Sequence, residues 1–287
     1  ADSAATDGID LEAVKAKYQY TIDLNTSFSG DDNLYVRLRS GNGDPLVFGD
    51  KNYGTYLSSD SSKYSDLLNV DKIWYTFPVG DSNTVWIGPK IENYYMHAPA
   101  PSIYKPVLKQ FALGGNGAAY GASTKAGAGW AYKADNGFAV SSNVVSGTSS
   151  LLTDDSAISW ATQVGYTQPQ YSASIMLNQK YNGWEDGYYS TTKGHYRLLD
   201  GATAAQQSAN STNFGLRAWW RPAETGTATP SISAGYDFSE IDITNKAIDE
   251  TDAWFVGLNW SDMFQADDTI GLAFGQPQTR EDETVDP

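Results

Sequence analysis

The sequence predicts an all-β fold, specifically a transmembrane, antiparallel, up-and-down β-barrel. Three observations support this prediction: apolar side chains recur at every second position, the composition favours strands and turns, and short connections alternate with long ones. The 287 residues include 27 Gly, 19 Tyr and 9 Trp. Glycine is frequent in turns and aromatic residues are enriched in strands, so this composition is typical of a β protein.

Alternation defines the strands, because successive side chains of a strand point to opposite faces. The first run has the apolar residues Tyr18, Tyr20, Ile22, Leu24 and Phe28 on one side and the polar residues Gln19, Thr21, Asp23, Asn25 and Ser27 on the other. Eleven further runs follow, with these apolar members: Leu34, Val36, Leu38; Ile73, Tyr75, Phe77, Val79; Val85, Ile87; Ala128, Trp130, Tyr132; Phe138, Val140, Val144; Ile158, Trp160, Val164, Tyr166; Tyr171, Ala173, Ile175, Leu177; Phe214, Leu216, Ala218, Trp220; Ile232, Ala234, Tyr236, Phe238; Trp254, Val256, Leu258, Trp260; Ile270, Leu272, Phe274. Because 40% of the residues are hydrophobic, four chosen positions are all apolar by chance roughly 3% of the time. Chance explains one or two such runs but not twelve.

A soluble β-sandwich would show the same alternation, since its apolar faces form the core. Two features favour the barrel. Aromatic residues recur near strand ends on the apolar face, as in the girdles of membrane barrels, at Tyr18, Tyr132, Tyr166, Tyr171, Trp220, Trp254 and Trp260. The opposite face is rich in Gly and Ser, which suits a concave inner wall.

The connections also favour a barrel. Shorter turns at 29–33, 80–83, 134–137, 167–170, 222–230 and 261–268 alternate with longer connections at 42–70, 92–123, 146–156, 181–212 and 239–251. Outer-membrane barrels have short turns on one side and long loops on the other. In that arrangement both ends of this chain lie on the loop side, so we expect residues 1–287 to be one barrel domain from the interior of a longer chain.

Composition excludes several classes of function. The formal net charge is −15, which argues against nucleic-acid binding, and no stretch is apolar for the ~20 residues that a membrane-spanning helix needs. Cysteine is absent and His97 and His195 are the only histidines, so we expect no disulfide, no metal centre and no cofactor. No convincing catalytic motif occurs, and we expect no enzymatic activity.

Four stretches resemble the cyanobacterial outer-membrane porins, the iron-uptake or carbohydrate-selective-type family: LNTSFSGDDNL at 24–34, LRSGN at 38–42, KIWYTFPVG at 72–80 and the Gly-rich stretch 114–121. This resemblance implies a 16-stranded barrel in the lipid bilayer of the outer membrane, with one strand before residue 1 and about three after residue 287. It also implies a homotrimer and attachment to peptidoglycan through an N-terminal S-layer-homology domain that these residues do not include.

The inward register predicts a basic pore wall. Nine basic residues share it, opposed by Asp23 and Asp237. They are the predicted pore-lining Arg37, Arg39, Lys72, Lys90, Lys125, Arg217 and Arg221, together with Lys133 and Lys180. Rings of Lys and Arg favour anions. The alternative is that these side chains pair with acids of the loops or with strands that are absent from these residues.

The connection 92–123 is the predicted constriction loop. It is long, aromatic and basic, and its candidate residues are Tyr95, Tyr104, Lys105, Lys109 and Phe111. Folded into the barrel, it would narrow the channel; alternatively it caps the barrel or contacts a neighbouring subunit. The inward-facing tryptophans, Trp74, Trp86 and Trp219, either stack on sugar rings or pack against this loop.

These observations predict a porin that lets small hydrophilic solutes and inorganic ions diffuse passively, with a preference for anions. Two alternatives remain at this stage. One is a secreted β-sandwich that binds glycans, and the other is an outer-membrane barrel enzyme such as a lipid hydrolase.

Overall fold

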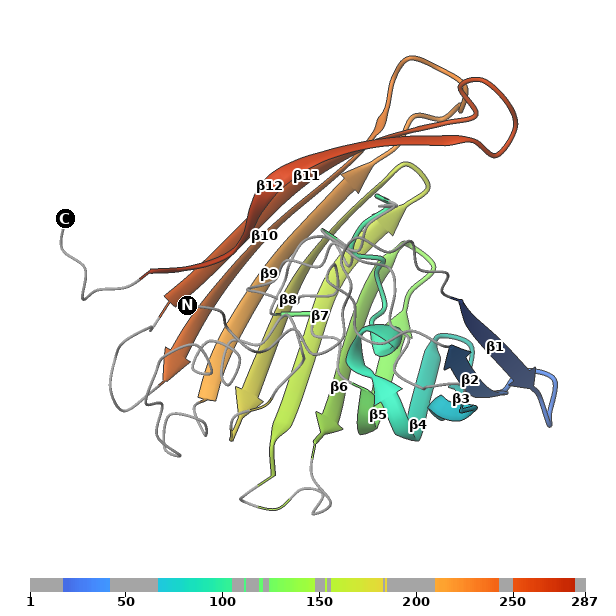
Figure 1. Cartoon of the computed structure of the whole chain (residues 1–287), viewed down its shortest axis with the longest axis vertical. Helices are drawn as coiled ribbons and strands as arrows, with labels where there is room; N and C mark the ends of the chain where they lie inside the picture. The colour runs from blue at the N-terminus through green and yellow to red at the C-terminus, as the bar shows by residue number, and fades with distance from the viewer. Residues whose placement is uncertain are drawn as a thin grey trace, which may run out of the picture.

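The computed structural model describes residues 18–41, 67–104, 111, 119–120, 124–147, 153, 156–182, 184, 210–242 and 250–281. These residues form one antiparallel sheet, which bends around a concave face (Figure 1). Its strands are β1 (Gln19–Thr26), β2 (Asn33–Gly41), β3 (Asn69–Val79), β4 (Asn83–Glu92), β5 (Thr124–Lys133), β6 (Phe138–Ser146), β7 (Ile158–Gln168), β8 (Tyr171–Tyr181), β9 (Asn210–Trp220), β10 (Ser231–Asp242), β11 (Glu250–Ser261) and β12 (Thr269–Glu281). A single turn of 3-10 helix, η1 (Asn93–Met96), follows β4.

Each strand pairs with the next one in the chain, so the order across the sheet is the order in the sequence. This topology confirms the prediction of an up-and-down meander of twelve strands, and the described residues hold no second sheet that would make a sandwich. Within them, no ladder joins β1 to β12. No described helix is long and apolar enough to cross a membrane.

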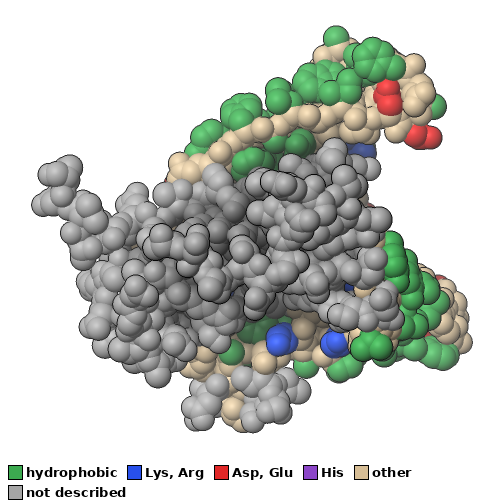
Figure 2. All heavy atoms as spheres, viewed as in Figure 1, with side chains coloured by type: hydrophobic (Ala, Val, Ile, Leu, Met, Phe, Trp, Pro, Cys, Tyr) green, Lys and Arg blue, Asp and Glu red, His purple; other side chains and the backbone are tan. Residues whose placement is uncertain are grey.

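The two faces of the sheet have opposite chemistry. On the outer face the predicted apolar side chains are exposed, for example Ile175 at 58%, Ile87 at 56% and Leu272 at 56%. Hydrophobic side chains cover the outer margin along β12 and around the first strands (Figure 2). The inner face buries polar side chains instead, including Gln163 and Asn178. This is the reverse of a water-soluble domain and matches a barrel with an apolar belt and a polar interior.

The connections follow the predicted alternation with one exception. Shorter turns at 27–32, 80–82, 134–137, 169–170, 221–230 and 262–268 alternate with the longer connections 42–68, 93–123, 147–157 and 182–209. The prediction of a long connection at 239–251 is wrong, because the β10–β11 ladder continues through Ser239↔Thr251 and Glu240↔Glu250. Only 243–249 joins these two strands, and that connection is no longer than the turn 262–268.

The β1–β2 turn is organised by one buried carboxylate. Oδ1 of Asp32 accepts hydrogen bonds from the backbone N–H groups of Phe28 (3.0 Å) and Ser29 (2.8 Å) and from the hydroxyls of Ser27 and Ser29. Its Oδ2 accepts a hydrogen bond from the Tyr75 hydroxyl. Donors that favour the ionised form lower the pKa of Asp32, with Tyr75 the largest contributor and the Ser29 N–H next.

Replacing Asp32 by Ala is expected to release this turn, because the two backbone N–H groups lose their acceptor. The expected result is faster hydrogen exchange at Phe28 and Ser29. In the unmodified protein the carboxylate stabilises the turn at every pH above its ordinary pKa of 3.8. Below pH 3.8 that stabilisation decreases progressively, and it is lost once pH falls through the lower folded-state pKa. Protection should therefore decline gradually below pH 3.8 rather than disappear there, after correction for intrinsic rates.

The matched control is Asp31→Ala, in the same turn but with an exposed side chain. It should leave the exchange of Phe28 and Ser29 unchanged. Equal effects of the two substitutions would contradict a special role for Asp32.

Candidate pore wall and constriction segment

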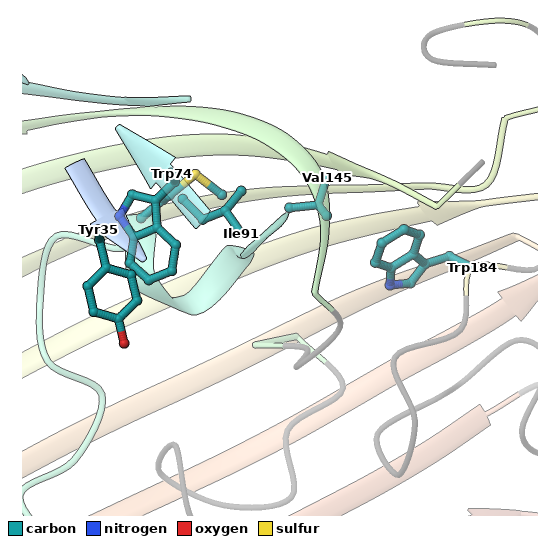
Figure 3. Packing of buried hydrophobic residues seen from close by; sticks show 6 residues of the cluster. Tyr35, Trp74, Ile91, Val145 and Trp184 are labelled. Carbon is teal, nitrogen blue, oxygen red and sulfur yellow. The ribbon is translucent and has the colours of Figure 1, made fainter. Parts of the chain in front are cut away.

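The chain that follows β4 lies on the inner face of the sheet; we call its described residues, 93–104, 111 and 119–120, the infolded segment. It begins after Glu92, the last residue of β4, which forms an ion pair with Lys72 and accepts a hydrogen bond from Thr124 Oγ1 (2.8 Å). Tyr95 then packs on Trp74, with ring centroids 4.7 Å apart. Figure 3 shows Trp74 beside Tyr35 and Ile91 in the buried cluster under this point.

From there the infolded segment crosses the sheet, and neutral side chains of four strands hold its backbone. Ser141 of β6, Gln163 of β7, Trp219 of β9 and Ser233 of β10 each bond its main chain. The contacts are Ala98 N to Ser141 Oγ (3.1 Å), Gln163 Nε2 to Pro99 O (3.2 Å), Trp219 Nε1 to Ala100 O (3.2 Å), and Ile103 N and Tyr104 N to Ser233 Oγ (3.1 Å each). A backbone buried against a wall needs such partners.

Glycines let the infolded segment lie directly on the wall. A Cβ at Gly129 would lie 2.7 Å from Met96 Sδ, and one at Gly257 would lie 2.6 Å from Tyr104 Cγ. Both distances are far below van der Waals contact, so only glycine fits at these two inner positions. The sequence predicts small side chains on the inner face. At these two glycines the infolded segment covers the wall, so the wall is not open to solvent there.

The described residues further along return across the same face. Phe111 stacks on Phe255 of β11, with centroids 5.8 Å apart. The carbonyl of Ala119 accepts a hydrogen bond from Asn178 Nδ2 (2.8 Å), and the Tyr120 hydroxyl accepts one from Gln163 Nε2 (2.9 Å). The described residues of the infolded segment thus contact the inner face from β4 to β11, and again at β7 and β8.

Of the predicted constriction residues, Tyr95, Tyr104 and Phe111 lie on the inner face, whereas Lys105 and Lys109 lie outside the described residues. In the described part, the segment runs along the wall rather than over the rim. The inward tryptophans pack: Trp74 contacts Tyr95, and Trp219 bonds the segment's backbone.

His97 is the one histidine within the described residues, and its burial lowers its pKa to about 3. Its Nδ1 lies 3.2 Å from Asn143 Nδ2, and its ring meets Tyr120 edge-on at 5.1 Å. The imidazole is therefore uncharged at neutral pH and acts as a packing group that joins the two passes of the infolded segment.

Four of the predicted pore-lining cations form ion pairs with acids. These are Arg37–Asp23 (2.7 Å), Arg39–Asp71 (3.6 Å), Lys72–Glu92 and Arg217–Asp237 (2.8 Å). Arg217 is 3% exposed, and its guanidinium carbon lies 4.8 Å from the centroid of the Tyr120 ring. The four cations are therefore ion-paired, as in the alternative interpretation, but their acids lie on described strands rather than in loops or absent strands.

Two β-bulges change which charges face inward. In β4, Gly88 and Pro89 together oppose one residue of β3, so the register moves from Tyr75↔Ile87 to Ile73↔Lys90. Lys90 therefore shares the outer face with Ile73, and the prediction that it lines the pore is wrong. A bulge re-aims the side chains beyond it, and accordingly Ile91 is fully buried on the inner side.

The second bulge, in β3, introduces an acid that alternation does not predict. The register passes from Arg37↔Lys72 to Leu38↔Val70, leaving Asp71 as the extra residue. From this position its carboxylate reaches the guanidinium of Arg39. Glu92, expected to start a loop, is the second acid that alternation missed.

The other basic residues of the predicted inward register differ in solvent exposure. Lys125 and Lys133 of β5 share the inner register of Ile91 and Ala139, their cross-strand partners, and are exposed. Arg221 follows β9 and is also exposed, with its Nε donating to Pro169 O (2.6 Å). Lys180 of β8 is fully buried.

Solved structures of outer-membrane proteins share this architecture. OprB of Pseudomonas putida superposes with a TM-score of 0.56 at 11% identity, covering 90% of this chain and 68% of that chain. A loop deletion mutant of OmpT, an outer membrane protein of Vibrio cholerae, gives 0.51 at 11% identity, covering 90% and 72%. No protein-family model matches the sequence, and no match was found among curated proteins. The fold is thus a porin-type transmembrane β-barrel fold.

Replacing Gly257 by Ala is expected to lift Tyr104 off the wall, because the three atoms nearest to the new methyl group all belong to that side chain. The bonds from Ile103 N and Tyr104 N to Ser233 should then open, and hydrogen exchange at both amides should accelerate by about tenfold. Mass-spectrometric exchange measures this. The double variant Gly257→Ala, Tyr104→Ala removes the two closest contacts, to Cγ and Cδ2, and leaves only the Cβ of residue 104 at 3.0 Å. It should restore most of the protection of Ile103, and no recovery there would contradict the steric explanation.

Proposed function

We propose that this protein is an outer-membrane porin that lets small hydrophilic solutes and inorganic ions diffuse passively through a water-filled channel. One observation carries the proposal: a sheet with an exposed apolar outer face has a polar inner face crossed by a long infolded segment. Such an outer face needs lipid around it, and a polar inner face lines a channel. The infolded segment narrows that channel.

Ion pairing makes the proposed anion preference small. The buried pairs Lys72–Glu92 and Arg217–Asp237 present little net charge to the channel. A modest excess of positive charge comes from the exposed Lys125 and Lys133, which have no inner-face acid as cross-strand partner. Lumen charge of one sign raises the local concentration of the opposite ion.

The assembly belongs to the proposal as well. The unpaired edges of β1 and β12 would leave backbone groups without partners in lipid. This supports closure by further strands, and we propose a 16-stranded barrel.

From the resemblance at 24–42 and 72–80, we also propose trimers, peptidoglycan attachment through an N-terminal domain, and membership of the cyanobacterial porin family. The permeating solutes would then include inorganic ions, iron species and sugars.

Planar bilayers test the channel directly. The full-length protein should give stepwise conductance, and replacing residues 98–119 by a short Gly-Ser linker should raise that conductance roughly twofold or more, because a wider channel conducts more. Shortening the 182–209 connection serves as the control for loop removal in general. Absence of conductance steps in the correctly inserted full-length protein would refute the porin proposal.

Replacing Leu216 by Arg tests the lipid-facing role of the outer face. Leu216 is exposed at the middle of β9. An arginine near the bilayer midplane costs about 2–4 kcal/mol of folding free energy in the membrane. Urea titration of folding into lipid vesicles measures this cost. Ala223→Arg, in the exposed β9–β10 turn, should cost little; equal stability of both variants would contradict a lipid-facing Leu216.

A further inference from the structure

The charged side chains of β1–β4 balance one another on the inner face. In these described strands the inner face holds three basic residues, Arg37, Arg39 and Lys72, and three acids that form ion pairs with them. Strict alternation would instead give four basic residues and Asp23 alone. The difference comes from the two bulges, which bring Asp71 to Arg39 and turn Lys90 outward, and from the last residue of β4.

The two arginine pairs are more accessible than the lysine pair. The side chains of Arg37 and Asp23 are 20% and 43% exposed, whereas those of Lys72 and Glu92 are 5% and 11% exposed. Arg39 and Asp71 are intermediate, at 17% and 13%. A permeating ion therefore meets Asp23, Asp71 and the two arginines more directly than it meets the lysine pair.

Asp23 is held in a fixed position. Its Oδ1 accepts hydrogen bonds from Arg37 Nε (2.7 Å) and from the Tyr35 hydroxyl (2.6 Å), and its Oδ2 accepts one from Arg37 Nη2 (3.3 Å). Cross-strand pairing places Asp23 opposite Arg37, and Arg37 opposite Lys72. The carboxylate thus lies at one end of a row of charges that crosses three neighbouring strands.

We propose that Asp23 and Asp71 determine the ion selectivity of the channel by cancelling the field of Arg37 and Arg39. This inference rests on the proposed porin function and identifies the residues that limit its anion preference. Removing either carboxylate takes one negative charge from beside a guanidinium. The field at that position then becomes more positive, and anions gain over cations.

The reversal potential of the full-length protein in a KCl gradient tests this proposal. Asp23→Asn and Asp71→Asn should each raise the chloride-to-potassium permeability ratio roughly twofold, and the double variant should raise it further. The shift should shrink from 0.1 M to 1 M salt, since the Debye length falls from about 10 Å to about 3 Å. Asp81→Asn, an exposed position in the β3–β4 turn, is the control.

The opposite substitution separates charge from damage to the wall. Arg37→Gln should move the permeability ratio toward potassium, whereas a merely structural disturbance gives no reversal of sign. This variant also carries the test if Asp23→Asn fails to assemble. Ratios within the range of the Asp81→Asn control, in channels that conduct normally, would overturn the proposal. Absence of conductance in the unmodified protein would instead contradict the porin function itself.

Discussion

The small size of the side chains on the inner face is the constraint on which the rest of the structure depends. The infolded segment can lie on the sheet only if the wall leaves room for it, and a single methyl group at Gly129 or Gly257 would overlap Met96 or Tyr104. The same face must also satisfy the backbone that it covers. Serine and amide side chains such as Ser233 and Gln163 do this, because they are short and offer donors or acceptors.

Most of the fold follows from the two-residue period of the sequence, because an alternating strand has only one register that turns its apolar residues outward. All twelve strands, and the outward position of residues such as Ile175 and Leu272, could be predicted in this way. Alternation predicts the wrong face for a side chain where a β-bulge interrupts the two-residue period. Gly88-Pro89 inside a strand is a signal for a bulge, since proline cannot donate to the ladder, and it accounts for the outward turn of Lys90.

The acids of the site were harder to predict than its bases. Asp71 has no glycine or proline beside it, and its inward reach depends on how β2 and β3 align, which is a property of the pair and not of either strand. The path of the infolded segment was also beyond sequence reasoning in detail. Its aromatic residues indicated packing, but the strands that would receive them depend on the curvature of the whole sheet. The partners of Tyr104 and Tyr120 are far away in the sequence.

Ion-paired residues contact the infolded segment where it leaves β4 and where it returns, and uncharged hydrogen-bonding groups hold it in between. The buried Lys72–Glu92 pair lies where it leaves β4, and Arg217, paired with Asp237, stacks under Tyr120 where it returns. A buried pair resists separation because either partner alone would be an unpaired charge. The contacts along the crossing involve hydroxyl, amide and indole groups, with an uncharged His97 beside them. In the proposed channel, salt would screen exposed charges but hardly affect neutral hydrogen bonds. On that proposal, the width set by the infolded segment is independent of ionic strength, whereas the charge balance at the exposed arginine pairs is not.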